Sequence, residues 1–372
     1  MSKIKVLFCI GNLNIGGAEK LILNQIKNID HNNFDPVLLT LFPEKKDSYT
    51  NLNNLPIPIY QSVGFKGPLD IVSWFKTYQL LKREKFDIIC THLFEANFII
   101  RFVNLFVRCP RVFVFEHNIY WKKAKWKILA DRFFSYQTTK IFVDSQAVLD
   151  FTSKQEKIAK DKFAVLPYPI ELAPLPDSTH LDNLKRELNL PADYVIVGSV
   201  ARFVEQKGLK YFLQAIRFIL DHQTLVKAHF LLVGYGNLEE ALKDEAKKLK
   251  LDSVLTFSPP RDIKTILPII DIFVLSSLWE GQPIAMLEAM AAKRAVVATN
   301  VGGVSEILLN RENGLIVEKE DSKALGKAIL ELINNKDLRL KLGQNGFDAA
   351  VSFGLPTYIK KLERFFLDAY GK

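Results

Sequence analysis

The sequence predicts an α/β protein made of two doubly wound domains, each with a parallel sheet between layers of helices. Short apolar, β-rich segments alternate along the whole chain with segments of helical periodicity, which is the pattern of repeated strand–helix units. The length of 372 residues favours two domains over one. We therefore expect a first domain at residues 1–170, a second at 171–354, and a last helical segment at 355–372.

The composition is that of a soluble globular protein, with 48% hydrophobic and 24% charged residues. No stretch of about 18 apolar residues is present, so we expect no membrane-spanning helix. The first residues lead directly into a strand rather than into a signal peptide. Cys9, Cys90 and Cys109 lie far apart without metal-ligand spacing. We interpret them as buried free thiols in a reducing compartment, which predicts a cytoplasmic protein.

The first domain opens with a buried strand at 3–10, a glycine-bearing loop at 11–17 and a helix at 18–29. Gly16 and Gly17 allow the backbone to approach a ligand closely. Their spacing is not that of a dinucleotide-binding motif, and a simple tight turn explains the loop equally well. Further strands are expected at 35–41, 86–91, 111–115, 141–144 and 163–166, and helices at 69–83, at 94–107 and after Ser145.

Two histidines, His92 and His117, follow predicted strands of the first domain. Ligands of parallel sheets collect at the carboxyl ends of the strands. A single histidine is more often structural than functional, and this is the interpretation we favour for His92. His117 is the better candidate for a binding or catalytic role, because it ends a strand on the ligand side.

Residues 1–170 carry the whole net charge of +9, because basic and acidic side chains are equal in number in the rest of the chain. The excess is concentrated where lysines and aromatic residues interleave, at Trp121, Lys122, Lys123, Lys125, Trp126 and Lys127, followed by Arg132, Phe133 and Phe134. This pattern predicts an anionic partner. An anionic membrane surface fits best, since aromatic rings enter the headgroup region while lysines meet lipid phosphates. The alternative is a solvated helix whose aromatic residues pack inward. A nucleic acid is not expected, because no recognised binding module accompanies the charge.

The second domain follows a proline-rich linker, residues 171–193, which includes a short helix at 181–188. Its first strand, 195–200, leads into a loop with Arg202, Lys207 and Gly208 before a helix that starts at Leu209. Two cations in front of a helix N-terminus make a site for an anion, although a solvated basic loop has the same composition. Strands at 228–233 and 254–257 and a helix at 238–249 continue the domain.

The most informative segment begins at residue 271. Carboxylates there can bind hydroxyls, and a helix N-terminus can bind a phosphate, so the segment suits a phosphorylated sugar or a nucleotide. Two ordinary surface carboxylates are the alternative. Pro283 is expected at the first helical position, where its missing N–H costs nothing. The segment is expected to begin with a buried strand at 271–276, followed by a loop with Glu280, Gln282 and Pro283 and a helix at 284–292 that contains Glu288. A strand at 295–299, the pair Gly302 and Gly303, and a helix near 304–309 come next. The chain is then expected to form a turn at 313–315, a helix at 321–333 and a last helix at 355–370.

Glu280 and Glu288, with Glu-Gly-x-Pro before the helix and Val-Gly-Gly-x-x-Glu after it, resemble the Glu-x7-Glu signature of the retaining glycosyltransferases of family 4 (GT4, glycosyl transferases group 1). The resemblance covers essentially the whole chain. It implies the GT-B fold, in which two Rossmann-like domains face a central cleft. It also implies that the second domain binds a nucleotide sugar, that the first meets the acceptor, and that the last helix crosses back to the first domain.

The resemblance implies a role for each candidate residue. Glu280 would bind the hydroxyls of the donor sugar, and Glu288 the ribose. His117 would point at the donor sugar or its phosphate, and with Glu280 it is the expected catalytic residue. The remaining donor-binding residues would be Gly16, Gly17, Arg202, Lys207, Gln282, Pro283 and Ile284. The sequence departs from the family pattern at 167–171 and at 258–261, so the nucleotide base is not predicted.

The reaction implied by the resemblance moves a sugar from a nucleoside diphosphate to an acceptor hydroxyl and keeps the anomeric configuration. No Asp-x-Asp motif occurs, so we expect neither a metal site nor a cofactor, with Arg202 and Lys207 neutralising the leaving group. The expected acceptor is a lipid-linked or membrane-borne glycan of lipopolysaccharide, capsule or a related polysaccharide. The protein would then be peripheral at the inner face of the cytoplasmic membrane. Two alternatives remain: a nucleotide-sugar 2-epimerase of GT-B-like fold, and a non-catalytic anion-binding protein.

Overall fold

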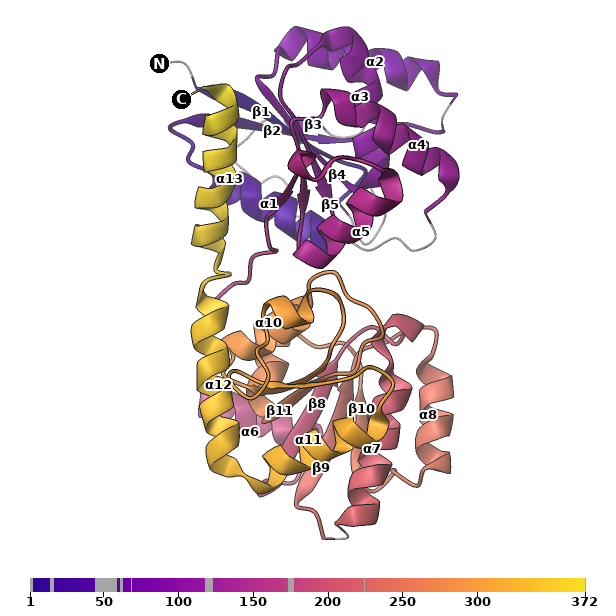
Figure 1. The fold of residues 1–372 in the computed structure, drawn as a ribbon, viewed down its shortest axis with the longest axis vertical. Helices are drawn as coiled ribbons and strands as arrows, with labels where there is room; N and C mark the ends of the chain where they lie inside the picture. Colours follow the sequence, from indigo (N-terminus) through magenta and orange to yellow (C-terminus); the bar gives the residue numbers. More distant parts are fainter. Residues whose placement is uncertain are drawn as a thin grey trace. The chain divides into compact units, whose positions relative to one another are not determined.

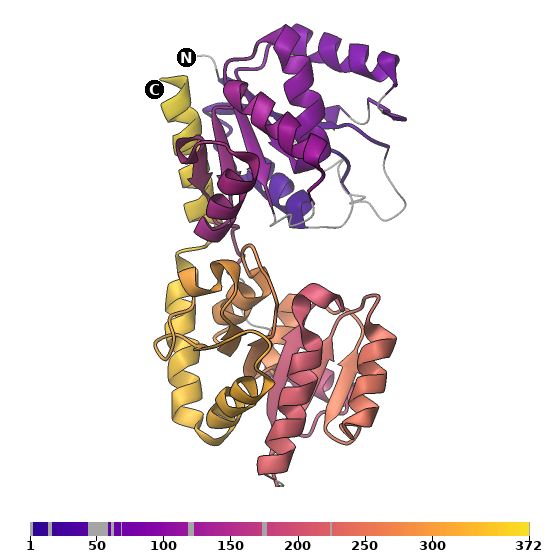
Figure 2. The ribbon, with the colours of Figure 1, turned by 45° about the vertical axis from the view of Figure 1, so that its right-hand side comes forward.

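The chain divides into two compact units, which are described separately. The computed structural model describes residues 3–13, 17–43, 59–60, 63–67, 69–117, 123–172, 177–223 and 225–371. The first unit comprises Met1–Pro169 and Leu355–Lys372, and the second comprises Ile170–Gly354. Each unit is a parallel sheet with helices on both faces (Figures 1 and 2). Two layered α/β units match the fold class predicted from the alternation of strands and helices.

The sheet of the first unit has seven strands in its described part, in the order β3-β2-β1-β4-β5-β6-β7, all parallel. The order runs outward in both directions from β1, which is the doubly wound arrangement. The strands are β1 Ile4–Ile10, β2 Phe34–Thr40, β3 Ile59–Tyr60, β4 Ile88–His92, β5 Val112–Glu116, β6 Lys140–Val143 and β7 Phe163–Val165. The helices are α1 Gly17–Asn28, α2 Ile71–Glu84, α3 Leu93–Val107, α4 Lys125–Phe134, α5 Gln146–Glu156 and α13 Leu355–Tyr370.

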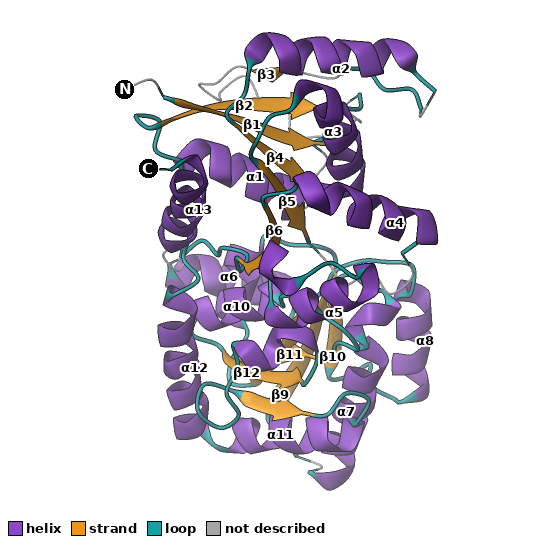
Figure 3. Cartoon of the chain, turned by 45° about the horizontal axis from the view of Figure 1, so that its top comes forward, coloured by secondary structure: helices purple, strands orange, loops and turns teal. Residues whose placement is uncertain are grey.

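The two faces of this sheet bury different helices. Helices α1 and α13 cover one face, and α2, α3 and α5 cover the other (Figure 3). The last helix, α13, is fixed to the first unit by Phe366, whose ring contacts those of Phe8 and Phe113. Gln25 also donates a hydrogen bond to the Tyr358 hydroxyl at 2.6 Å. The chain therefore returns to its first unit at its C-terminal end.

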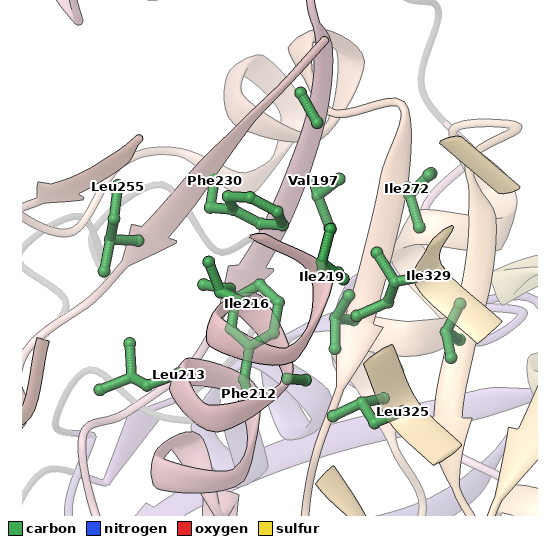
Figure 4. Packing of buried hydrophobic residues seen from close by; sticks show 14 of the residues in the cluster. Val197, Phe212, Leu213, Ile216, Ile219, Phe230, Leu255, Ile272, Leu325 and Ile329 are labelled. Atoms are coloured by element: carbon green, nitrogen blue, oxygen red, sulfur yellow. The ribbon is translucent and has the colours of Figure 1, made fainter. Parts of the chain in front are cut away.

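The sheet of the second unit has the order β10-β9-β8-β11-β12-β13 in the described residues and is again parallel. One face packs on α7 and α11, where Phe212, Ile216 and Leu325 contact strand residues such as Val197 and Phe230 (Figure 4). The strands are β8 Val195–Val200, β9 Ala228–Val233, β10 Leu255–Ser258, β11 Ile272–Leu275, β12 Ala295–Thr299 and β13 Leu315–Val317. The helices are α6 Ser178–Glu187, α7 Leu209–His222, α8 Glu239–Lys248, α9 Ile263–Ile266, α10 Ile284–Ala291, α11 Ser322–Asn334 and α12 Lys336–Val351.

Two local expectations for this unit were wrong, and one helix was not predicted. The helix expected near 304–309 is a 3₁₀ helix, Gly302–Glu306. It stops because the Asn313 side chain accepts from the Leu309 N–H and donates to the Ile307 carbonyl. Pro283 is the N-cap residue of α10 rather than its first helical residue. Helix α12 was not predicted, because Gly343 and Gly346 interrupt its helical signal.

The cysteines are free and buried in the structure, as predicted. Among the described helices, none is both long and apolar enough to cross a membrane.

A buried cluster of charges joins four elements of the first unit, and Lys123 lies at its centre. The Lys123 side chain is 5% exposed, and its Nζ lies 2.5 Å from Glu156, 2.7 Å from Asp131 and 3.8 Å from Glu116. Arg101, which is fully buried, pairs with Asp131 as well. The prediction that Lys123 belongs to a surface patch is therefore wrong. Its ammonium group is enclosed by carboxylates from β5, α4 and α5, which offset the cost of burying it.

The cluster contains two cations and three carboxylates, so it holds one negative charge in excess. Burial and then the neighbouring Glu116 carboxylate raise the pKa of Glu156 to about 8. Glu156 therefore binds a proton more readily in the folded state than in the unfolded chain, where the ordinary value is 4.5. Such a group stabilises the fold fully below its unfolded pKa, and the stabilisation is lost as the pH rises through the folded value.

We predict that Glu156→Gln flattens the pH dependence of stability. The wild type should lose free energy of unfolding between pH 4.5 and 8, whereas the variant should lose less, because its amide cannot titrate. Urea denaturation across this pH range measures the effect. Asp150→Asn is the matched control: it lies on the same helix, and a hydrogen bond from Lys160 lowers the pKa of Asp150. Equal slopes in the wild type and Glu156→Gln would show that Glu156 does not carry the extra proton.

Candidate functional site

In the second unit, the loops that follow β8 and β11 bring Lys207 and Glu280 together. The two strands are neighbours in the sheet, so their carboxyl ends lie side by side. Lys207 Nζ donates to Glu280 Oε1 at 2.6 Å, and the Ser277 hydroxyl donates to the same oxygen at 2.6 Å. Glu280 is 4% exposed. The other carboxylate oxygen, Oε2, makes no hydrogen bond to any described residue, so it is left for a ligand.

The two loops are joined by backbone contacts that require a glycine. Gly208 has a φ of 56°, and a Cβ there would lie 2.2 Å from the Ser276 carbonyl oxygen. The Ser276 hydroxyl donates to the Lys207 carbonyl at 2.9 Å, and the Leu278 N–H donates to the Gln206 carbonyl at 2.8 Å. Any side chain at Gly208 would push the loops apart. Gly208 therefore sets the separation of Lys207 and Glu280.

A third loop, which follows β12, supports Glu280 from the opposite side. Gly302 has a φ of 53°, and a Cβ there would lie 1.8 Å from the Glu280 carbonyl oxygen. The Gly303 N–H donates to the Gly281 carbonyl at 2.9 Å, and the Thr299 hydroxyl donates to the Ser277 carbonyl at 2.6 Å. The sequence predicted Gly302 and Gly303 only as a break before a helix. Their contacts with the Glu280 loop appear only once β11 and β12 are paired.

Helix α10 begins directly after this loop. Gln282 and Pro283 are buried, and the helix starts at Ile284. Its N-terminal end carries a partial positive charge and peptide N–H groups, which suit a phosphate. Glu288 is half-buried in the second turn of the helix. All the donor-site residues expected in this segment therefore lie along a single loop and helix.

Arg202 differs from Lys207 in its surroundings. It lies in the loop after β8 and is exposed, and it has no hydrogen bond or ion pair to any described residue. Lys207, in contrast, is already paired with Glu280. An anion that enters this loop therefore meets the uncompensated charge of Arg202 and the helix end, while the Lys207–Glu280 pair is close to neutral.

In the first unit, the structure brings together the two histidines that the sequence treated separately. His92 Nδ1 lies 3.2 Å from His117 Nε2, at the carboxyl ends of the neighbouring strands β4 and β5. The His92 ring stacks on Phe115 with their centroids 4.2 Å apart. His92 is fully buried, which agrees with the structural role expected for it, and it also contacts one nitrogen of His117. Gly17, the first residue of α1, also belongs to this unit. Gly16, Trp121 and Lys122 lie outside the described residues.

Both histidines are neutral at pH 7. Burial lowers the pKa of His117 to about 4, and burial, together with the neighbouring His117, lowers the pKa of His92 well below its ordinary value. His92 Nε2 is buried without a hydrogen-bond partner among the described residues. An orphaned N–H is rarer than an orphaned acceptor, which favours a proton on His92 Nδ1 that is donated to His117. His117 then carries its own proton on Nδ1, where it can donate to a ligand.

The remaining members of the predicted basic patch lie on α4. Lys125 and Trp126 are exposed, whereas Lys127 is half-buried with its Nζ 4.1 Å from the centre of the Phe94 ring. Trp126 also packs edge-on against Phe94.

Among the described residues, no group of three or more His, Cys, Asp or Glu side chains could hold a metal ion.

Comparison with known protein families identifies both halves of the chain. Residues 15–173 match the model described as Glycosyltransferase Family 4, and residues 182–349 match the model described as Glycosyl transferases group 1. The chain is a GT-B glycosyltransferase of family 4. The family predicted from Glu280, Glu288 and their context is thereby confirmed.

Curated relatives of this glycosyltransferase include enzymes named for lipid-linked acceptors. It is 26% identical over 312 residues, 80% of each chain, to the UDP-Gal:alpha-D-GlcNAc-diphosphoundecaprenol alpha-1,3-galactosyltransferase of Escherichia coli. It is 33% identical to the N,N'-diacetylbacillosaminyl-diphospho-undecaprenol alpha-1,3-N-acetylgalactosaminyltransferase of Campylobacter jejuni, over 47% of this chain and 46% of that one. With that enzyme and several others, the match thus spans less than half of the relative's length.

A solved structure shows the same fold over nearly the whole chain. Anabaena HepE, in complex with UDP, gives a TM-score of 0.84 at 18% identity and covers 98% of this chain and 100% of its own. The GT-B fold expected from the sequence is therefore confirmed.

For this glycosyltransferase we predict that Lys207 and Glu280 act as one unit, whereas Arg202 acts alone. Lys207→Ala leaves a buried carboxylate without its cation, so it should weaken donor binding and lower thermal stability. Each lost charge-assisted contact should cost about 1.5–3 kcal/mol. The effect of Lys207→Ala should shrink in a Glu280→Gln background, with a coupling of about 0.5–3 kcal/mol.

Arg202→Ala is the matched control, since it removes a cation from the same loop but no internal contact. It should reduce donor affinity while leaving the melting temperature unchanged. Isothermal titration with donor and thermal denaturation of the four variants measure both effects. Additive losses in the double variant, or normal kinetics in both Lys207→Ala and Arg202→Ala, would sink the assignment.

We further predict that activity shows no ionisation near the ordinary histidine pKa of about 6.5, because His117 stays neutral down to about pH 4. His92→Phe keeps a ring on Phe115 but removes Nδ1, so it should lower kcat/KM by about fivefold, equal to one hydrogen bond of about 1 kcal/mol. Rates between pH 5 and 9, with His222→Gln on the surface as control, test this. An acid limb near pH 6.5 that disappears in His117→Gln would contradict it.

Proposed function

We propose that this glycosyltransferase moves a hexose from a nucleoside diphosphate to a hydroxyl group of a lipid-linked glycan, with retention of anomeric configuration and without a metal. The observation that carries the proposal is the Lys207–Glu280 pair beside the N-terminus of α10. The pair supplies a carboxylate with one oxygen that no described residue hydrogen-bonds, the N-terminal end of α10 lies beside it, and Arg202 in the loop after β8 adds an unpaired cation. A sugar diphosphate needs the same set of partners.

Each group has a distinct task in this proposal. Glu280 Oε2 accepts hydrogen bonds from hydroxyls of the donor sugar, while Lys207 and Ser277 fix the other oxygen of the carboxylate. Glu288 on α10 meets the ribose. Arg202 and the helix N-terminus stabilise the negative charge that develops on the departing diphosphate. Stabilisation of developing charge by groups held in place is commonly the largest single contribution to catalysis.

The reaction requires no nucleophile from the protein. The acceptor oxygen bonds to the anomeric carbon as the bond to the diphosphate breaks, and the acceptor proton passes to the leaving phosphate. His117, with a proton on Nδ1, donates a hydrogen bond to the donor sugar or its phosphate. Metal independence is part of the proposal, since Arg202 and the N-terminal end of α10 take the neutralising role that Mg²⁺ has in other enzymes.

The relatives support the proposed acceptor. The enzymes of E. coli and C. jejuni are both named for glycans on diphosphoundecaprenol. We therefore propose that this chain acts in the synthesis of a bacterial surface polysaccharide, as a peripheral protein at the cytoplasmic face of the membrane. UDP-sugars are the first donors to test, because UDP-Gal appears in the name of the E. coli enzyme.

The test begins with a thermal-shift screen of UDP-, GDP- and ADP-sugars, followed by transfer to a diphosphoundecaprenol-linked sugar in the presence of excess chelator. We predict transfer with an unchanged anomeric configuration, read by NMR, and no stimulation by Mn²⁺ or Mg²⁺. Glu280→Gln should fold normally and lose activity at least about 100-fold, the usual effect of removing one group that stabilises the transition state.

The controls separate this proposal from the other activities considered for the sequence. Sugar products that form equally well without an acceptor would indicate epimerisation or hydrolysis. Donor binding with no turnover under any condition would indicate a binding protein. Activity that disappears with chelator and returns with Mg²⁺ would falsify metal independence.

A further inference from the structure

Helix α3 of the first unit buries its arginine and exposes apolar residues on its outer face. Its Arg101 is fully buried, where it pairs with Asp131 of α4. Its outer face exposes Phe102, Leu105 and Phe106, and Phe106 is 65% exposed. A surface helix normally turns its apolar stripe inward and its charges outward. The outer face of α3 is therefore suited to an apolar contact rather than to water.

The exposed apolar face continues onto the two helices that pack beside α3. Helix α2 exposes Ile71 by 79% and Phe75 by 57%. Ring contacts connect the three helices: Trp74 and Phe102 have centroids 5.1 Å apart, and Phe98 and Trp126 have centroids 6.0 Å apart. Exposed patches of this extent mark interaction surfaces. We define the apolar band as Ile71, Val72, Phe75, Phe102, Leu105, Phe106, Trp126, Leu129 and Phe133.

The band contains a groove between α2 and α3. Its volume is about 360 Å³, within the range of small-molecule sites. Tyr78 lines the groove, and the Lys82 ammonium group donates to the Tyr78 hydroxyl at 3.0 Å. A cation thus stands at one end of an otherwise apolar groove, which suits a hydrocarbon chain with a phosphate at its head. The lining residues are Ile71, Trp74, Phe75, Tyr78, Phe102, Val103 and Phe106.

The charges around the band complement an anionic surface. The exposed charged residues of α2, α3 and α4 are one carboxylate, Glu95, and five cations: Lys76, Lys82, Arg83, Lys125 and Arg132. Cations near a membrane are attracted to anionic lipids. Tryptophan and tyrosine, which occur here as Trp126 and Tyr78, are typical of the membrane–water interface. Apolar residues on three helices, with cations among them, fit an extended lipid layer better than a single soluble ligand.

We propose that the apolar band is the surface by which this protein lies on an anionic phospholipid bilayer, and that the α2–α3 groove takes up one acyl chain of a phospholipid whose phosphate meets Lys82. The inference rests on the peripheral location given under the proposed function and names the surface that produces it. It differs from the patch predicted by the sequence. Lys123 has no part in it, and α2 and α3 supply most of the contact.

The first experiment is co-sedimentation with phosphatidylcholine vesicles that do or do not contain phosphatidylglycerol. The wild type should pellet with the anionic vesicles, and the triple variant Ile71→Ser, Phe75→Ser, Phe106→Ser should stay in solution. Leu225→Ser with Leu340→Ser is the matched control, since both leucines are exposed on the second unit. Lys76→Gln with Lys82→Gln should lower partitioning about 25-fold, because each cation contributes about 1 kcal/mol.

The second experiment tests the groove through Trp74, which lines it. Anionic vesicles with brominated acyl chains should quench the fluorescence of the wild type. The quenching should fall in Trp74→Phe and, because Trp126 belongs to the band, also in Trp126→Phe. Equal quenching in the wild type and Trp74→Phe would overturn the assignment of an acyl chain to the groove.

Other occupants of the band give different results. A second copy of the chain would produce a dimer in light scattering without lipid, which the triple variant would abolish. If the groove is reserved for the lipid-linked acceptor, polyprenyl diphosphate should protect the fluorescence of Trp74 from quenching, and phospholipid should not. Either result, or the absence of binding to anionic vesicles at low salt, overturns the inference.

The failure of this inference can be distinguished from that of the proposed function by an assay without membranes. The triple variant should still bind the nucleotide sugar and transfer to a short-chain, water-soluble acceptor at the wild-type rate. If the wild type transfers to that acceptor but ignores vesicles, only the bilayer surface is wrong. If it binds vesicles through the band but transfers nothing, only the proposed function is wrong.

Discussion

The burial of one carboxylate, that of Glu280, determines the local architecture of the second unit. A carboxylate removed from water is costly unless cations and hydrogen-bond donors surround it. Lys207 and Ser277 supply these partners at 2.6 Å each. Lys207 comes from a different loop, so the loops after β8 and β11 must touch, and Gly208 and Gly302 make that approach possible. A side chain at either glycine would clash with the backbone of the Glu280 loop, so both glycines are needed for this arrangement of the loops.

The first unit buries charges in a different way. Lys123 and Arg101 meet three carboxylates inside the fold, and the cluster leaves neither cation exposed to a ligand. Burial, and then the neighbouring Glu116 carboxylate, raise the pKa of Glu156. Lysine and glutamate thus serve the fold in one unit and the candidate site in the other. The two lysines differ in exposure, because the Lys207 side chain is 19% exposed while that of Lys123 is 5% exposed.

Much of the fold could be predicted because buried parallel strands are continuous apolar runs, as at β8, β9 and β12. Helix α12 could not, since Gly343 and Gly346 weaken its signal. Gly343 is there for packing, because a Cβ at this position would lie 2.4 Å from the Lys293 carbonyl oxygen. The motif around Glu280 predicted the donor loop, but not its ion pair with a lysine 73 residues away in the sequence. The contact of His92 with His117 likewise depends on the pairing of β4 with β5.

The sequence of α3 and α4 does not show which side chains point into the fold and which point outward. Residues 97–107 are the most membrane-like stretch of the chain, and Arg101 is its one charge. In the structure this stretch is a helix with two apolar faces, one on the sheet and one outward, and Arg101 is neutralised by Asp131 of α4. The lysine run before α4 divides in the same way, since Lys123 turns inward while Lys125 remains exposed. The net charge of the first half is therefore not a uniform patch. Only the cations that remain outside are accessible to a partner, and they lie beside exposed apolar residues of the same two helices and α2.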